Sequence, residues 1–133
     1  MMNRAKEKIR IKGVVTGGLK EGQYFLLREG YTKQIREKLG FIPYPGTLNI
    51  RTKVRVRLPE KPACVLEGFS EEGERYGDVL CYEAVLLHNE KKVKCFVVRP
   101  LLSSEKEVIE VMHEKRLRSM LGLEDEDEVE LWL

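Results

Sequence analysis

A threonine and an asparagine stand two positions apart where a proline-rich turn leads into an apolar segment. Alternate residues of a strand point to the same side, so the hydroxyl of Thr47 and the amide of Asn49 are predicted to face one way. Such hard oxygen donors suit Mg²⁺ when phosphates supply its other ligands. A rigid turn with a hydrogen-bonded asparagine explains the same residues, and that alternative stays open at this point.

Residues 17–23 form a second candidate, a glycine-rich segment that follows a predicted strand. Backbone amides in a segment of this kind can point inward together and bind phosphate. The segment is not a P-loop, because the terminal Gly-Lys-Ser/Thr is missing and a strand rather than a helix is predicted to follow. An ordinary glycine-rich turn between strands is the simpler alternative.

Two further segments combine polar groups with the predicted ends of elements. Residues 99–104, followed by residues 107–110, place hydroxyls near carboxylates. Residues 113–118 open a predicted helix, whose first amides and cationic side chains could hold an anion. A polar turn and a solvated helix face are the respective alternatives.

The elements that must position these residues are short. Alternating apolar residues and flanking glycines and prolines predict strands at residues 9–15, 23–27, 48–58, 64–69, 77–87, 92–98, 107–112 and 129–133. Helical spacing predicts two short helices, at residues 31–39 and 113–121, each followed by a glycine. Residues 88–90 are predicted to form a tight turn. Short strands with closely spaced turns indicate a mainly β fold that closes into a barrel, with a sandwich as the second choice.

Length and composition predict one domain that spans residues 1–133, with 42% hydrophobic and 35% charged residues. A net charge of +2 is too small to indicate a nucleic-acid partner by itself. Arginines and lysines alternate with smaller residues between Arg51 and Arg57, however, so a nucleic-acid-binding barrel remains an alternative. We nevertheless expect a monomer that binds no nucleic acid.

The three cysteines, Cys64, Cys81 and Cys95, form no CxxC pair and stand in apolar segments. They are predicted to be buried free thiols in a reducing compartment, without a zinc site. The sequence has no apolar run of about 18 residues, and residues 1–10 are charged with no apolar h-region, so we expect no secretory leader. We therefore expect a cytoplasmic protein with no membrane partner.

Four segments, taken together and in this order, resemble the archaeal CTP-dependent riboflavin kinase family. They are Glu21-Gly22-Gln23-Tyr24-Phe25, Pro45-Gly46-Thr47-Leu48-Asn49, Val97-Val98-Arg99-Pro100-Leu101 and Leu121-Gly122-Leu123. The similarity covers nearly the whole chain, from about residue 11 to residue 133. It implies a closed six-stranded cradle-loop β-barrel with two short helices. It also implies transfer of the terminal phosphoryl group of CTP to the 5′-hydroxyl of riboflavin, which gives FMN and CDP.

The same resemblance implies roles for individual residues. Thr47 and Asn49 would hold one Mg²⁺, and Ser103 and Glu110 would contact the flavin. The nucleotide would be bound by Gly18, Leu19, Lys20, Glu21, Gly22, Gln23, Lys115, Arg116, Leu117 and Arg118.

This chain departs from the family pattern in two places. The family usually has Arg-Thr-His where this chain has Leu102-Ser103-Ser104, so Leu102 competes with Ser103 for the flavin-side position. The family also tends to have Ala-Pro in place of His113-Glu114. A nucleotide- or flavin-binding module without catalysis is therefore a further alternative.

Overall fold

The computed structural model describes residues 9–17, 26–101 and 107–133. Its helices and strands are β1 (Arg10–Thr16), α2 (Glu29–Leu39), β2 (Leu48–Arg51), β3 (Cys64–Leu66), β4 (Phe69–Glu71), β5 (Glu74–Tyr76), β6 (Val79–His88), β7 (Lys91–Pro100), β8 (Val108–Met112), α3 (Leu117–Leu121) and β9 (Glu128–Trp132). Among these described elements, no helix is long and apolar enough to cross a bilayer.

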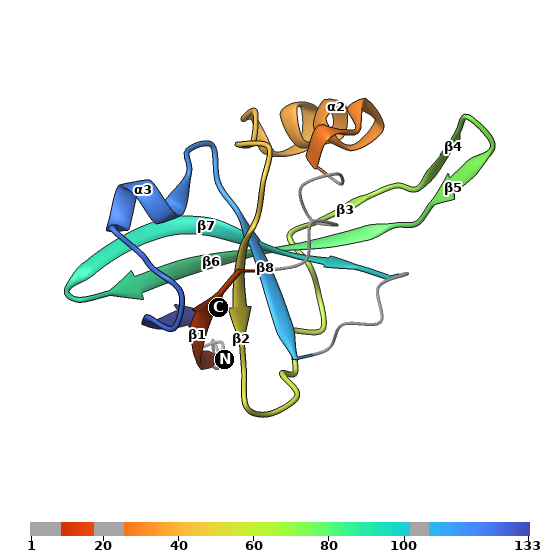
Figure 1. The fold of residues 1–133 in the computed structure, drawn as a ribbon. Coiled ribbons are helices and arrows are strands. Elements are labelled where there is room, and N and C mark those ends of the chain that lie inside the picture. The colour runs from red at the N-terminus through yellow and green to blue at the C-terminus, as the bar shows by residue number, and fades with distance from the viewer. Residues whose placement is uncertain (1–8, 18–25, 102–106) are drawn as a thin grey trace, which may run out of the picture.

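Six antiparallel strands close a ring in the order β6-β7-β8-β2-β1-β9, because β9 pairs with both β1 and β6. The ring can close because β6, with ten residues, is long enough to pair with two strands along one edge. One edge of β6 binds β9 through residues 85–87 and the edge strand β3 through residues 79–81. Both helices lie toward the end of the ring where β2 begins and β8 ends (Figure 1).

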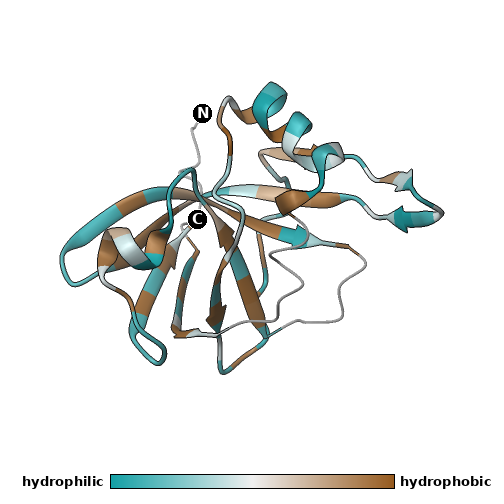
Figure 2. Ribbon diagram, turned by 45° about the horizontal axis from the view of Figure 1, so that its top comes forward, coloured by the Kyte–Doolittle hydropathy of each residue, from teal (hydrophilic) through white to brown (hydrophobic). Residues whose placement is uncertain are grey.

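The interior of the ring is filled by alternate residues of its strands, among them Ile11, Val15 and Leu131. Strands β1 and β2 approach closely at Gly13. A Cβ there would lie 2.6 Å from Cγ2 of Ile50 and 2.7 Å from the backbone oxygen of Arg51. Only glycine fits this position without displacing backbone. Figure 2 shows apolar residues concentrated on the ring strands and polar residues on the β4–β5 hairpin.

A second apolar cluster lies on the outer face of the sheet, under α2. Tyr31 and Ile35 of this helix pack with residues of β3, β6, β7 and β8. The Tyr31 hydroxyl also donates a hydrogen bond to the oxygen of Gly77 at 2.6 Å. The helix ends at Gly40, which is left-handed at φ +80°. The outer face is therefore covered next to β8, which carries one of the candidate residues.

The predicted mainly β fold with two short helices is confirmed for the described residues, and the closed ring rules out the sandwich. The predicted strand at residues 23–27 is wrong at Leu26 and Leu27, which are helical, and its other residues lie outside the described part. The predicted segment 64–69 is split between β3 and β4. The β4–β5 hairpin was not predicted, and it turns at Glu72 and Gly73, both with positive φ.

The predicted strand at residues 48–58 is wrong after Arg51. Thr52 ends it, because its hydroxyl lies within hydrogen-bonding distance of the oxygens of both Val54 and Glu107. The predicted helix at residues 113–121 begins only at Leu117, because Nδ1 of His113 accepts a hydrogen bond from the Lys115 amide in a local turn.

Candidate active site on the outer face of the ring

Three oxygen-bearing side chains meet on the outer face of β2 and β8. The hydroxyl oxygen of Thr47 lies 3.1 Å from Oδ1 of Asn49 and 3.2 Å from Oε1 of Glu110. The strand register explains the meeting, since Asn49 stands directly opposite Glu110. Their neighbours Leu48, Ile50, Ile109 and Val111 pack inside the ring, so Asn49 and Glu110 face outward. We call these three residues the oxygen cluster.

The proton count of the oxygen cluster indicates what it can bind. A threonine hydroxyl carries one proton, so Thr47 can donate to only one of its two neighbours at a time. Three oxygens of three residues thus gather around one proton, which is the donor set that a hard divalent cation prefers. The described residues contain no group of three or more His, Cys, Asp and Glu side chains that could hold a metal. A cation here would therefore need further oxygens from a ligand such as a phosphate.

The oxygen cluster lies beside the end of β1. Thr16, near the end of that strand, is the register partner of Asn49. The glycine-rich segment begins directly after it, at Gly17. The nucleotide-binding residues predicted within that segment, Gly18 to Gln23, lie outside the described residues. The structure does establish that the chain enters this segment next to Thr47 and Asn49, the predicted metal ligands.

Arg118 of α3 reaches the same end of β1. Its Nη2 donates to the oxygen of Thr16 at 3.0 Å and to Oδ1 of Asp125 at 2.7 Å. One cationic side chain therefore joins three segments: the end of β1, helix α3 and the acidic turn after it. No pattern in the sequence indicates a role for Asp125, which lies within an acidic run at residues 124–128.

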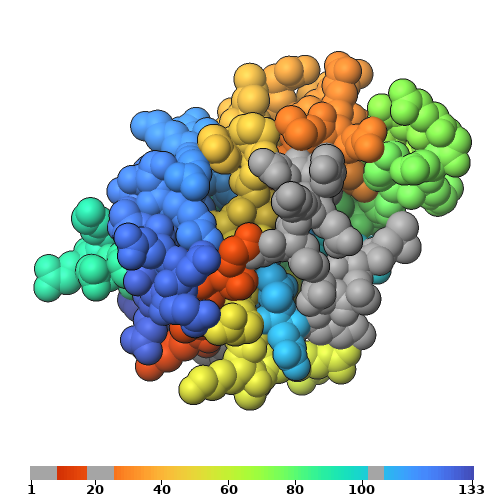
Figure 3. Space-filling model, viewed as in Figure 1, coloured from red at the N-terminus to blue at the C-terminus, as the bar shows by residue number. Residues whose placement is uncertain are grey.

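The proline-rich turn before Thr47 is attached to the segment that leads into α3. The amide of Tyr44 donates to the oxygen of His113 at 2.8 Å. A second short-range bond, from the amide of Gly46 to the oxygen of Tyr44 at 2.7 Å, tightens the turn. Figure 3 shows the two segments side by side on one face, next to the end of β1. This attachment fixes where Thr47 enters the oxygen cluster.

The other predicted nucleotide-binding residues, at and before the start of α3, differ in their accessibility. Lys115 and Arg116 are exposed, and Nη1 of Arg116 donates to the hydroxyl of Ser119 at 3.0 Å. The side chain of Leu117 packs inside the ring, so this residue could offer a ligand only its backbone. Ser103 and the competing Leu102 lie outside the described residues. Glu110, predicted to contact the flavin, stands in contact with the predicted metal ligand Thr47.

Comparison with known proteins assigns a family. The family model described as "CTP-dep_RFKase: Domain of unknown function DUF120" matches residues 15–133. The chain belongs to this CTP-dependent riboflavin kinase domain family. The resemblance inferred from the four sequence segments is thereby confirmed.

Named relatives of this riboflavin kinase family come from archaea. The chain is 43% identical to a riboflavin kinase of Ignicoccus hospitalis over 129 residues, which cover 92% of this chain and 70% of that protein. It is 41% identical to the riboflavin kinase of Archaeoglobus fulgidus, with coverage of 92% and 54%, and 40% identical to that of Methanocella arvoryzae, with coverage of 92% and 56%. The chain thus spans little more than half the length of the last two relatives.

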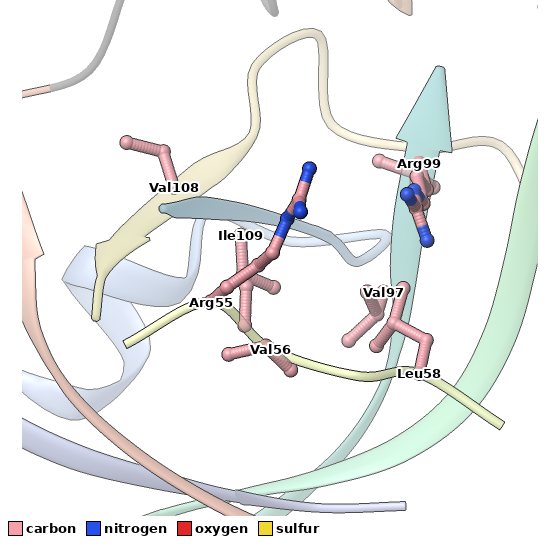
Figure 4. Close-up of a pocket in the computed structure, with 8 residues that line it drawn as sticks. Arg55, Val56, Leu58, Val97, Arg99, Val108 and Ile109 are labelled. Atoms are coloured by element: carbon pink, nitrogen blue, oxygen red, sulfur yellow. The ribbon is translucent and has the colours of Figure 1, made fainter. Parts of the chain in front are cut away.

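The structure also has a hollow that the sequence did not predict. It has a volume of about 50 Å³ and lies near the start of β8. Val56, Leu58, Val97 and Ile109 form its apolar wall, and Arg55 and Arg99 stand beside it (Figure 4). Val97 and Ile109 belong to the interior of the ring. Val98, which also lines the hollow, belongs to the outer apolar cluster and stands opposite Glu110.

The basic segment between Arg51 and Arg57 does not form the continuous strand predicted for it. Arg51 pairs with Glu126 at 3.0 Å, and Thr52 is buried. Val56 packs against the interior of the ring. Because the segment leaves the sheet after Arg51, its cations do not alternate along a strand.

Proposed function

We propose that this chain catalyses transfer of the terminal phosphoryl group of CTP to the 5′-hydroxyl of riboflavin, with release of CDP and FMN. The observation that carries the proposal is the oxygen cluster beside the end of β1, in a chain of the CTP-dependent riboflavin kinase family. Curated archaeal relatives at 40–43% identity are named riboflavin kinases. We further propose a monomeric cytoplasmic domain, a cradle-loop barrel of residues 1–133, without nucleic-acid or membrane partners.

Phosphoryl transfer needs mainly alignment and neutralisation of charge, so the proposed roles are roles of positioning. Thr47 and Asn49 would hold one Mg²⁺, which neutralises charge on the nucleotide phosphates when bound. Glu110, at the edge of the same cluster, accepts a hydrogen bond from the ribityl chain and orients the attacking hydroxyl. Ser103 provides a second contact to the flavin.

The nucleotide is proposed to lie along the glycine-rich segment and the start of α3. Backbone amides of residues 18–23 bind the phosphates, and Lys115, Arg116 and Arg118 supply positive charge, with the backbone of Leu117 between them. Arg118 has the best-defined position, because Thr16 and Asp125 hold it at the start of the glycine-rich segment.

The direct test is incubation of the purified chain with riboflavin, Mg²⁺ and either CTP or ATP, with FMN and the nucleoside diphosphate separated by chromatography. We expect FMN and CDP in equal amounts with CTP, and far less FMN with ATP. Binding of riboflavin without formation of FMN from either nucleotide would instead establish the non-catalytic alternative. Equal rates with both nucleotides would contradict the CTP preference.

Asp125→Asn tests the positioning of Arg118. The change removes the charge that holds the Arg118 guanidinium, so we expect the KM for CTP to rise roughly 5- to 10-fold, as a loss of about 1 kcal/mol would cause. The effect on kcat should be smaller. The Asp125 side chain is 63% accessible, although that of Arg118 is only 23% accessible, so stability should change by about 1 kcal/mol at most.

Glu126→Gln is the matched control for this variant. Glu126 is the next residue, is equally exposed and pairs with Arg51 on the surface. It does not contact Arg118. A KM for CTP that rises equally in the two variants would mean that general surface charge, and not the position of Arg118, determines the effect.

A further inference from the structure

Two of the three cysteines meet across the β3–β6 pair. Cys64 stands directly opposite Cys81 in the register of these antiparallel strands. Residues in that relation have Cα atoms about 4.5–5.5 Å apart. A disulfide requires about 4.4–6.8 Å between its Cα atoms. The backbone of the two strands therefore already meets the distance requirement for a disulfide.

The two side chains also lie on the same side of the sheet. Cys81 belongs to the apolar cluster under α2, and Cys64 packs against that cluster. Burial raises the pKa of the Cys81 thiol far above its ordinary value, and the charge and hydrogen bond of the Cys64 thiol raise this pKa further. The two thiols thus face each other across the β3–β6 pair, and both are free.

The two thiols differ in accessibility in a way that gives the oxidation an order. Cys64 is partly exposed, whereas Cys81 is completely buried. Cys95, the third cysteine, lies inside the ring, where its register partner is Ala84. Burial raises the pKa of the Cys95 thiol to about 12. A dissolved oxidant can therefore reach Cys64 first, and Cys81 is the thiol placed to respond.

We propose that Cys64 and Cys81 are an oxidation site, at which a low-molecular-weight disulfide converts the two thiols to one intramolecular disulfide. The thiolate of Cys64 attacks one sulfur of the small disulfide, and the other half leaves as a thiol after taking a proton. The Cys81 thiol then loses its proton and attacks the Cys64 sulfur, which releases the second half as a thiol. The two cysteines lose two electrons and two protons in total, and the small disulfide gains them.

The disulfide would connect the edge of the sheet covalently to the ring. Strand β3 pairs only with β6 among the described strands, and it is three residues long. Helix α2 is attached to this edge by side-chain bonds. The side-chain nitrogen Nε2 of Gln34 donates to the backbone oxygen of Glu67 at 2.8 Å. Nζ of Lys38 donates to the backbone oxygen of Val65 at 2.6 Å. Linking β3 to β6 would therefore stabilise the attachment of α2, which covers the outer apolar cluster.

Oxidised glutathione is the probe for this site, and the measurement is a count of free thiols in denaturant together with intact mass. After incubation of the folded full chain and removal of small molecules, we expect only Cys95 to remain free. The mass should fall by two hydrogens, and peptide mapping should find Cys64 joined to Cys81. The thermal midpoint should rise by roughly 5–15 °C, and a reductant should reverse the rise.

Two variants make the result specific. Cys95→Ala should lose both remaining thiols in the same way, whereas Cys64→Ser should keep Cys81 and Cys95 free. The proposal is overturned if the wild-type chain keeps three free thiols. It is also overturned if glutathione stays attached to Cys64 while Cys81 is free, or if the disulfides join different chains.

Discussion

Asn49→Ala is expected to lower kcat for FMN formation by about 100- to 1,000-fold, the usual cost of removing one group that stabilises charge in a transition state. The change removes the oxygen that lies 3.1 Å from the Thr47 hydroxyl and stands opposite Glu110. Thr47 keeps its contact with Glu110, so the free energy of unfolding should fall by only about 1 kcal/mol. Steady-state kinetics at saturating CTP and riboflavin, together with denaturant unfolding, measure the two quantities.

Thr52→Ala is the control for this variant. Thr52 is the other buried polar residue of the described part, and it follows the opposite end of β2. Its hydroxyl bonds to backbone oxygens only. We expect a loss of stability of about 1–2 kcal/mol with kcat within twofold of wild type. A normal kcat in Asn49→Ala, or an equal loss of kcat in both variants, would remove Asn49 from the proposed site.

Leu131→Ala should be among the most destabilising single substitutions, with a loss of about 3–4 kcal/mol. Leu131 is completely buried, and it stands opposite Ile11 of β1 and Leu86 of β6, where the ring closes. Truncation would leave a cavity between three strands that cannot collapse without opening the ring. Equilibrium unfolding in denaturant measures the loss.

Leu133→Ala is the comparison for Leu131. Leu133 lies just beyond the same strand and is partly exposed, so its truncation should cost about 1 kcal/mol. Equal losses in the two variants would mean that the seam between β1, β9 and β6 does not carry more of the stability than the end of the chain.

Local patterns predicted the elements that local interactions determine. Tyr31, Ile35 and Leu39 at helical spacing, with Gly40 after them, predicted α2. The apolar alternation of β6 and β7 predicted the hairpin, and its turn is at Asn89 and Glu90, both with positive φ. The alternation between residues 51 and 57 was misleading, because β2 ends where its partner β8, far along the chain, begins: Arg51 stands opposite Val108. No local pattern contains that information.

In the candidate site, too, local contacts were predictable from the sequence and long-range contacts were not. Alternation along one strand placed Thr47 and Asn49 on one side, and the structure brings them into contact. The contact with Glu110 depends on the β2–β8 register, across 63 positions of sequence. The bond from Arg118 to Thr16 spans 102 positions. The pairing of Cys64 with Cys81, which were predicted to be separate buried thiols, is likewise a matter of register.

The role of the oxygen cluster is tested most directly by measuring Mn²⁺ binding in the presence of CDP. Binding is detected in electron paramagnetic resonance as a loss of the signal of free Mn²⁺. The proposed site predicts that Asn49→Ala weakens this binding at least about 10-fold, whereas Thr52→Ala leaves it unchanged. Equal affinity of the wild-type chain and Asn49→Ala for Mn²⁺ and CDP would contradict the account.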